Sequence, residues 1–160
     1  MKGLIIVILL AAAGYFVYQK YAGGPPQTFE NPVYGEMRMT ASVGNREIEA
    51  AVFVRASDDL DCKGRGLLSW RETFEGCPSC KLQEPKCHAV LPPRYARLFD
   101  NVPIPSAYLS ADAGNAAERD GRVVIYGLTD AEGAQMCELL KAEAAKKYEG
   151  KLTCIAPSGG

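Results

Sequence analysis

The sequence predicts an α+β protein. One N-terminal transmembrane helix is expected before a single disulfide-stapled domain, which has a mainly antiparallel sheet and one C-terminal amphipathic helix. Three observations predict this fold class. Residues 3–18 carry no charge, a Gly44-Asn45 pair lies between two alternating segments, and a helical apolar repeat runs from Thr129 to Gly150. The first pattern is typical of a membrane span, the second of a β-hairpin and the third of a packed helix.

The uncharged N-terminal segment is expected to cross a membrane once. Its sixteen residues, 3–18, would form a helix of about 24 Å, close to a hydrocarbon core of about 30 Å. The apolar run continues past Ala11-Ala12-Ala13 to Tyr18, which argues against cleavage at the small residues. Residues 1–22 are therefore expected to be a transmembrane anchor or an uncleaved signal.

Charge around this segment predicts its orientation. Lys2 and the amino terminus lie on one side and Lys20 on the other, which favours a cytoplasmic amino terminus. The expected location is the inner membrane, single-pass, with the bulk of the chain in the periplasm. Residues 23–33, which include Gly23-Gly24-Pro25-Pro26, are expected to form a linker before one periplasmic domain at 34–160.

The composition excludes one class of partner. The chain has 18 Lys and Arg, of which Lys2 and Lys20 flank the anchor, so 16 remain beside all 19 Asp and Glu. The outer domain therefore carries a formal charge of 16 − 19 = −3. Nucleic-acid binding usually needs a clustered basic face, so no nucleic-acid partner is predicted.

The Gly44-Asn45 turn predicts a hairpin and its register. With Val43 opposite Arg46, every second pair is apolar, and these residues are expected to form the buried face. The pairs on this face are Ala41 with Ile48, Met39 with Ala50, Met37 with Val52, and Gly35 with Val54. The other face carries Glu36, Arg38, Thr40 and Ser42 opposite Phe53, Ala51, Glu49 and Glu47.

The C-terminal third predicts a strand, a helix and a final strand. Residues 122–128 are a strand by composition, expected to pair antiparallel with 106–111, while 92–99 suit a short helix with proline in its first turn. Thr129 and Glu132 form a capping-box pattern. The apolar face of the following helix is expected to contain Gly133, Met136, Cys137, Leu140, Ala144 and Tyr148.

Six cysteines lie beyond the anchor, where thiols tend to form disulfides. They are Cys62, Cys77, Cys80, Cys87, Cys137 and Cys154. The first interpretation is three structural disulfides. Four of the cysteines, Cys62, Cys77, Cys80 and Cys87, lie in a long irregular segment at 57–93 that such bonds would stabilise, and the other two flank the last helix. Six cysteines allow 15 complete pairings, but the strand after Gly150 runs back along the last helix, so a Cys137–Cys154 bond is favoured.

A second interpretation treats Cys77-Pro78-Ser79-Cys80 as a redox pair, because thiols at this spacing can close a disulfide. These four positions resemble the active-site motif of thioredoxin-like oxidoreductases. The resemblance implies Cys77 as the nucleophile and Cys80 as the resolving thiol. It covers this motif alone.

Metal binding is the third interpretation of the cysteines. Cys77, Cys80 and Cys87 with either Cys62 or His88 would make four zinc ligands. An oxidising compartment works against four thiolates, so no metal and no cofactor are predicted. His88 is the only histidine, and its expected role is that of a loop residue. The acidic residues at 58, 59 and 61 suit a solvated turn better than a calcium loop.

With no catalytic set evident, the predicted function is a membrane-anchored periplasmic module that binds another envelope protein without catalysis. It would act as an assembly accessory or as an inhibitor. The expected partner-binding residues are aromatic residues in or near the cysteine-rich segment at 57–93, namely Trp70, Phe74, Tyr95 and Phe99. The alternatives are an anchored thiol-disulfide oxidoreductase that uses Cys77 and Cys80, and a cell-wall-binding domain.

Overall fold

The computed structural model describes residues 24–64 and 80–158. Its seven strands form one sheet in the order β3-β1-β2-β6-β5-β7, with β4 also paired to β1, and all the pairs are antiparallel. The strands are β1 Val33–Val43, β2 Arg46–Ala56, β3 Cys80–Leu82, β4 Lys86–His88, β5 Tyr108–Asp112, β6 Gly121–Tyr126 and β7 Lys151–Ile155.

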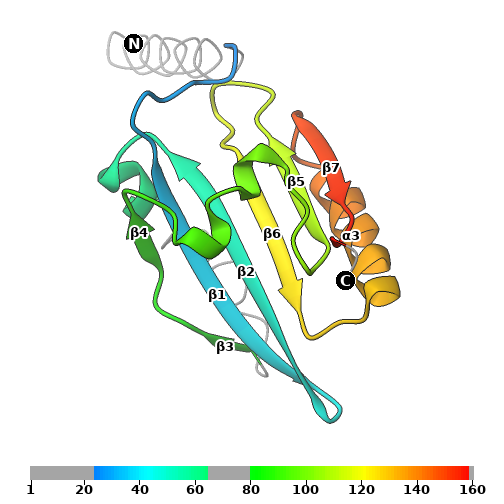
Figure 1. Cartoon of the computed structure of the whole chain (residues 1–160). Coiled ribbons are helices and arrows are strands. Elements are labelled where there is room, and N and C mark those ends of the chain that lie inside the picture. The colour runs from blue at the N-terminus through cyan, green and yellow to red at the C-terminus, as the bar shows by residue number, and fades with distance from the viewer. Residues whose placement is uncertain (1–23, 65–79, 159–160) are drawn as a thin grey trace, which may run out of the picture.

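Three further elements cover the sheet (Figure 1). The short turns η1 (Pro93–Tyr95) and η2 (Leu98–Asp100), drawn in green, lie in front of β2 and β6. The helix α3 (Asp130–Ala144) lies beside β7 on the other side. A helical segment also starts at residue 59 and reaches residue 64, the last described residue before the gap.

The predicted hairpin is confirmed in its register. Val43 pairs with Arg46, and the pairing continues through Met39 with Ala50 to Val33 with Ala56. Gly44 adopts a φ of 60°, the left-handed conformation that glycine allows in such a turn. The antiparallel pairing of residues 106–111 with 122–128 is also confirmed, with bounds that become β5 and β6.

The expected apolar face is buried at Met37 and Ala50, which are 5% and 8% exposed, but the expectation that only one face is buried is wrong. The face that carries Glu36 and Arg38 is buried as well. Phe53 and Ala51 are completely buried on this face, and Glu36 opposite Phe53 is only 7% exposed. Tyr95 from η1 covers them, with its ring centroid 4.5 Å from that of Phe53. Because this face carries polar residues, the alternation of apolar and polar residues predicts that it is exposed to solvent.

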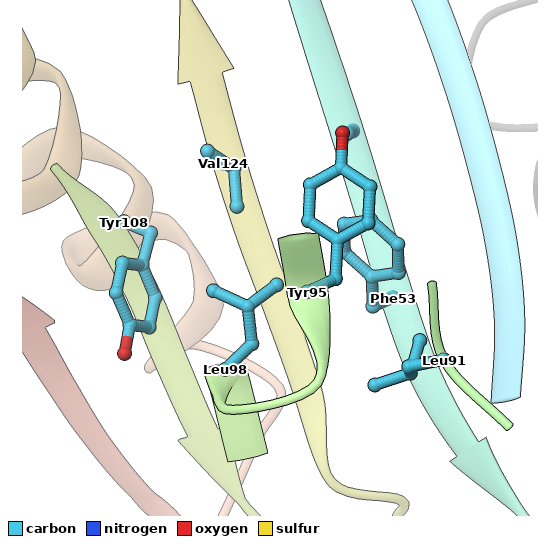
Figure 2. Packing of buried hydrophobic residues seen from close by; sticks show 7 residues of the cluster. Phe53, Leu91, Tyr95, Leu98, Tyr108 and Val124 are labelled. Carbon is cyan, nitrogen blue, oxygen red and sulfur yellow. The ribbon is translucent and has the colours of Figure 1, made fainter. Parts of the chain in front are cut away.

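The core cluster joins this face to η1 and η2 (Figure 2). Leu98 of η2 lies between Tyr108 and Tyr95, close to Val124 of β6. The buried members of the core cluster are Ala51, Phe53, Leu91, Tyr95, Leu98, Tyr108 and Val124. Burying a large apolar side chain contributes about 1.5–3 kcal/mol, so this layer supplies much of the stability of the domain.

One arginine fastens η2 to the sheet from inside this layer. Arg122 of β6 is 1% exposed, and its Nε donates to the Leu98 carbonyl at 3.0 Å. Its Nη1 donates to the carbonyls of Ala111 and Gly121, and its Nη2 donates to the Phe99 carbonyl and to Asp112 Oδ1, the last at 2.8 Å. A buried guanidinium is tolerated because these acceptors replace its water.

The helix α3 is less amphipathic than the sequence predicts. Its capping box is confirmed, since Glu132 N donates to Thr129 Oγ1 and Thr129 N donates to Glu132 Oε2. Cys137 is its only buried residue, whereas Met136, expected on the inner face, is 36% exposed. A disulfide between Cys137 and Cys154, with an S–S distance of 2.02 Å, ties this helix to β7.

The predicted fold class is corrected by these findings. The described residues form a mostly antiparallel sheet domain with two disulfides, and α3 is an accessory to the sheet rather than half of an α+β core. Among residues 24–64 and 80–158, no helix has the length and apolar character needed to span a membrane. The span expected at 3–18 lies outside the described residues.

Part of the segment expected to be a linker contacts the domain. The Gly24 carbonyl accepts a hydrogen bond of 3.0 Å from the Ala116 N–H. The Arg119 guanidinium lies 5.3 Å from the centre of the Phe29 ring. These residues therefore touch the β5–β6 loop.

Replacing Arg122 by methionine should lower the free energy of unfolding by about 3 kcal/mol, because four backbone carbonyls and Asp112 lose their donor. Urea denaturation monitored by tyrosine fluorescence measures this change. Arg97→Met is the matched control, since Arg97 is exposed, and it should stay within about 0.5 kcal/mol of the parent. Equal effects of both substitutions would contradict the assignment.

Candidate functional site

A polar cluster occupies the buried face of the sheet at its β1 end. Arg38 of β1 lies at its centre, with Nε donating to Glu36 and Nη1 donating to Glu49 on β2. Its Nη2 donates to the Tyr95 hydroxyl at 2.6 Å. One guanidinium thus joins two strands to η1, as the fork of arginine donors allows.

His88 extends this cluster to the edge of the sheet. Pairing between β4 and β1 places His88 opposite Tyr34, and its Nε2 lies 2.6 Å from Glu36 Oε2. Burial raises the pKa of Glu36, but hydrogen bonds and charge from Arg38 and His88 outweigh it, so the pKa lies below its ordinary value. The Glu36 side chain therefore stays ionised on the buried face of the sheet.

Two further side chains close the cluster towards β6. The Arg94 guanidinium lies 5.2 Å from the ring centre of Tyr95 and 4.9 Å from that of Tyr126. The Tyr126 hydroxyl is buried and makes no hydrogen bond of good geometry within the described part of the chain. Burial and the neighbouring Tyr95 raise its pKa.

The arrangement of this cluster suits a structural role, in which it holds η1 against the sheet. Glu36, Arg38 and Glu49 neutralise one another in part, and Tyr95 occupies the space above them. The Arg38–Tyr95 hydrogen bond holds η1 on the sheet. Among the described residues there is also no group of three or more His, Cys, Asp or Glu arranged to hold a metal ion.

An open hollow of about 420 Å³ lies next to the cluster. It separates the start of β1 from the chain that leaves β4, because Ala89–Leu91 turns away towards η1 just after His88 pairs with Tyr34. Val90, which is 79% exposed, lies on one side, and Leu91, which is 5% exposed, belongs to the core. The other lining residues are Glu30, Asn31, Pro32, Val33, Tyr34, Ala89 and Ala96.

The hollow has the properties of a site for a short apolar segment. Most of its lining is apolar, while Glu30 and Asn31 are exposed polar residues at its margin. Two of its lining residues are held in place by the fold, since Tyr34 lies on β1 and Leu91 packs into the core cluster. A rigid apolar recess with a polar margin is typical of small binding sites.

The structure describes two of the four predicted partner-binding residues, Tyr95 and Phe99. Tyr95 is 4% exposed and belongs to the core, and Phe99 packs against it, with its ring centre 5.3 Å from that of Tyr34. Trp70 and Phe74 lie outside the described residues. Tyr95 therefore lies in the buried core, and Phe99 is half-buried against it.

Sequence reasoning missed Val90 and Leu91. Their signal is an apolar pair between a cysteine-containing strand and Pro92-Pro93, where a polar loop would be expected. The structure separates this pair, since Leu91 is buried and Val90 is exposed to solvent.

Five of the six cysteines are described, and all five are disulfide-bonded. Cys62 bonds to Cys87 with an S–S distance of 2.03 Å, which ties the helical segment at 59–64 to β4. Cys137 bonds to Cys154, the pair that the sequence favours. Cys80 begins β3 and is also bonded, and Cys77 lies outside the described residues.

Glu36→Gln should weaken the loss of stability in acid. The pKa of Glu36 is lowered by folding, so its contribution is complete above the ordinary value of 4.5 and is lost as the pH falls through the folded value. Urea denaturation at pH 7 and pH 3 should show a less stable variant at pH 7 and a smaller difference between the two pH values. The exposed Glu47, changed to Gln, should leave the pH profile unaltered. A parallel downward shift of the Glu36→Gln curve at both pH values would refute the coupling.

The comparisons with known proteins name no family for this arrangement. No protein-family model, curated protein sequence or solved structure matches the chain.

Proposed function

We propose that the protein is a non-enzymatic module that binds another envelope protein in an oxidising compartment of the periplasmic type. The observation that carries this proposal is the hollow between β1 and the Ala89–Leu91 segment, with its highly exposed Val90. A large apolar side chain left in water beside a rigid recess favours a partner that covers it.

The size and charge of the hollow suggest what enters it. A volume of about 420 Å³ suits a few side chains and is too small for a folded domain. The Glu30 carboxylate at the margin and the formal charge of −3 on the outer domain favour a partner segment with a basic residue. The proposed occupant is an extended segment of the partner that places apolar side chains against Val90 and Tyr34.

The disulfides support the proposed compartment. Cys62–Cys87 and Cys137–Cys154 close loops with sequence separations of 25 and 17, and each such bond typically adds about 2–4 kcal/mol. Bonds of this kind persist where thiols are oxidised. Periplasmic exposure remains part of the proposal, as does an accessory or inhibitory role towards the partner.

The two alternative functions stay predictions. A thiol-disulfide oxidoreductase requires Cys77 and Cys80 to exchange with a mild reductant while the other bonds resist. A cell-wall-binding domain requires retention on purified peptidoglycan.

A photo-crosslinking amino acid at position 90 should capture a specific partner in intact cells, and the same residue at position 43 should not. Val43 is the matched control because it is also an exposed valine, 58% accessible, at the distant hairpin tip. With the purified partner, calorimetry should then show at least a tenfold weakening for Val90→Asp and an unchanged affinity for Val43→Asp.

Equal crosslinking at both positions, or an unchanged affinity for Val90→Asp, would exclude the hollow as the docking site. Thermal unfolding of both variants controls for folding. Since both valines are exposed, neither substitution should disturb the core.

A further inference from the structure

The two edges of the sheet are finished in different ways. The edge at β1 is capped, because β4 pairs with Tyr34–Glu36 and β3 pairs with Met39–Ala41. Between them, Gln83 N–H donates to the Arg38 carbonyl at 2.9 Å. The opposite edge ends at β7, which pairs with β5 alone in the described part of the chain.

An outer strand exposes half of its backbone hydrogen-bonding groups. In an antiparallel pair, alternate residues direct N–H and C=O groups towards the neighbour and the others direct them away. Within the described ranges, no backbone group outside the sheet pairs with residues 151–155. Such a row of donors and acceptors is recognised by another extended chain.

β7 contains neither proline nor a bulge, two of the features that protect a sheet edge. Proline and bulged residues block strand addition, as do charges along the strand. Residues 151–155 contain no proline, and their one charge is Lys151 at the first position. The remaining four residues, from Leu152 to Ile155, are half-buried.

The edge is held rigidly in its extended form. The Cys137–Cys154 bond ties β7 to α3 one residue before the end of the strand. At its start, Gly150 lies so close to β5 that a Cβ there would be 2.0 Å from the Asp112 carbonyl oxygen. A partner strand would therefore meet a preorganised template, which lowers the entropic cost of binding.

We propose that β7 is a docking edge for an extended segment of a partner polypeptide, which adds to the sheet as an eighth strand. The partner segment is proline-free, has alternating apolar or β-branched residues, and carries an acidic residue where it passes Lys151. This surface lies at the other end of the strand order from the hollow, so the proposal stands independently of the proposed function.

The test uses the oxidised full chain and a random nonapeptide library displayed on phage. Selected peptides, once synthesised, should slow amide hydrogen exchange at alternate residues of β7, as measured by NMR. Protection should follow this alternation because only outward-facing N–H groups gain a partner. Peptides that protect residues elsewhere, or a selection that yields no binder, would overturn the proposal.

Thr153→Lys provides a second measurement, since a lysine within an edge strand disfavours strand addition. The variant should bind the selected peptides at least tenfold more weakly. Thr40→Lys is the matched control, because it adds the same charge to β1 where β3 caps the edge, and it should bind as the parent does. Equal affinities for the two variants, or protection of β7 by a second copy of the chain in place of the peptide, would also overturn the proposal.

Discussion

The burial of Arg122 is the constraint on which the rest of the fold depends. Its guanidinium lies in the interior between the sheet and η2, where a charge is costly unless all its donors are satisfied. Five hydrogen bonds satisfy it, and they reach η2, β5 and the start of β6. The position of the covering segment is therefore fixed by donors on the sheet as well as by apolar packing.

Arg38 has the same role at the other end of this layer. It binds Glu36 and Glu49 on the sheet and the Tyr95 hydroxyl on η1, so each covering turn has its own arginine. Between the two arginines, Leu98 and Tyr95 pack on Phe53 and Val124. This arrangement also sets the proposed binding surfaces, because the Ala89–Leu91 segment leaves β4 to reach η1 and opens the hollow as it does so.

Local patterns in the sequence predicted local structure well. The Gly44-Asn45 turn determined the hairpin register, and Thr129 with Glu132 located the start of α3, because these signals depend on neighbouring residues. Burial was harder to predict. Glu36 and Arg38 made one hairpin face look solvent-exposed, although they are buried by mutual pairing under Tyr95, a residue 57 positions along the chain from Arg38. Contacts between residues so far apart in the chain produce no periodic pattern in the sequence.

The candidate site was predictable only in part, for the same reason. Aromatic residues near the cysteine-rich loop suggested a partner surface, but Tyr95 and Phe99 complete the core. The sequence does not mark Val90, because the hollow beside it forms only where the start of β1 and the chain after β4 come together in the fold. Cys137 and Cys154 were the exception, since a helix followed by a returning strand brings them together by geometry alone.

The exchange rate of the Arg122 Nε–H tests this account most directly. If the guanidinium is sealed under η2, its Nε–H should exchange only through global unfolding, with a protection equal to that of the most stable core amides. NMR of the native protein measures both rates in one sample. Exchange of Arg122 as fast as that of the exposed Arg97 would contradict the claim that a buried guanidinium holds the covering layer in place.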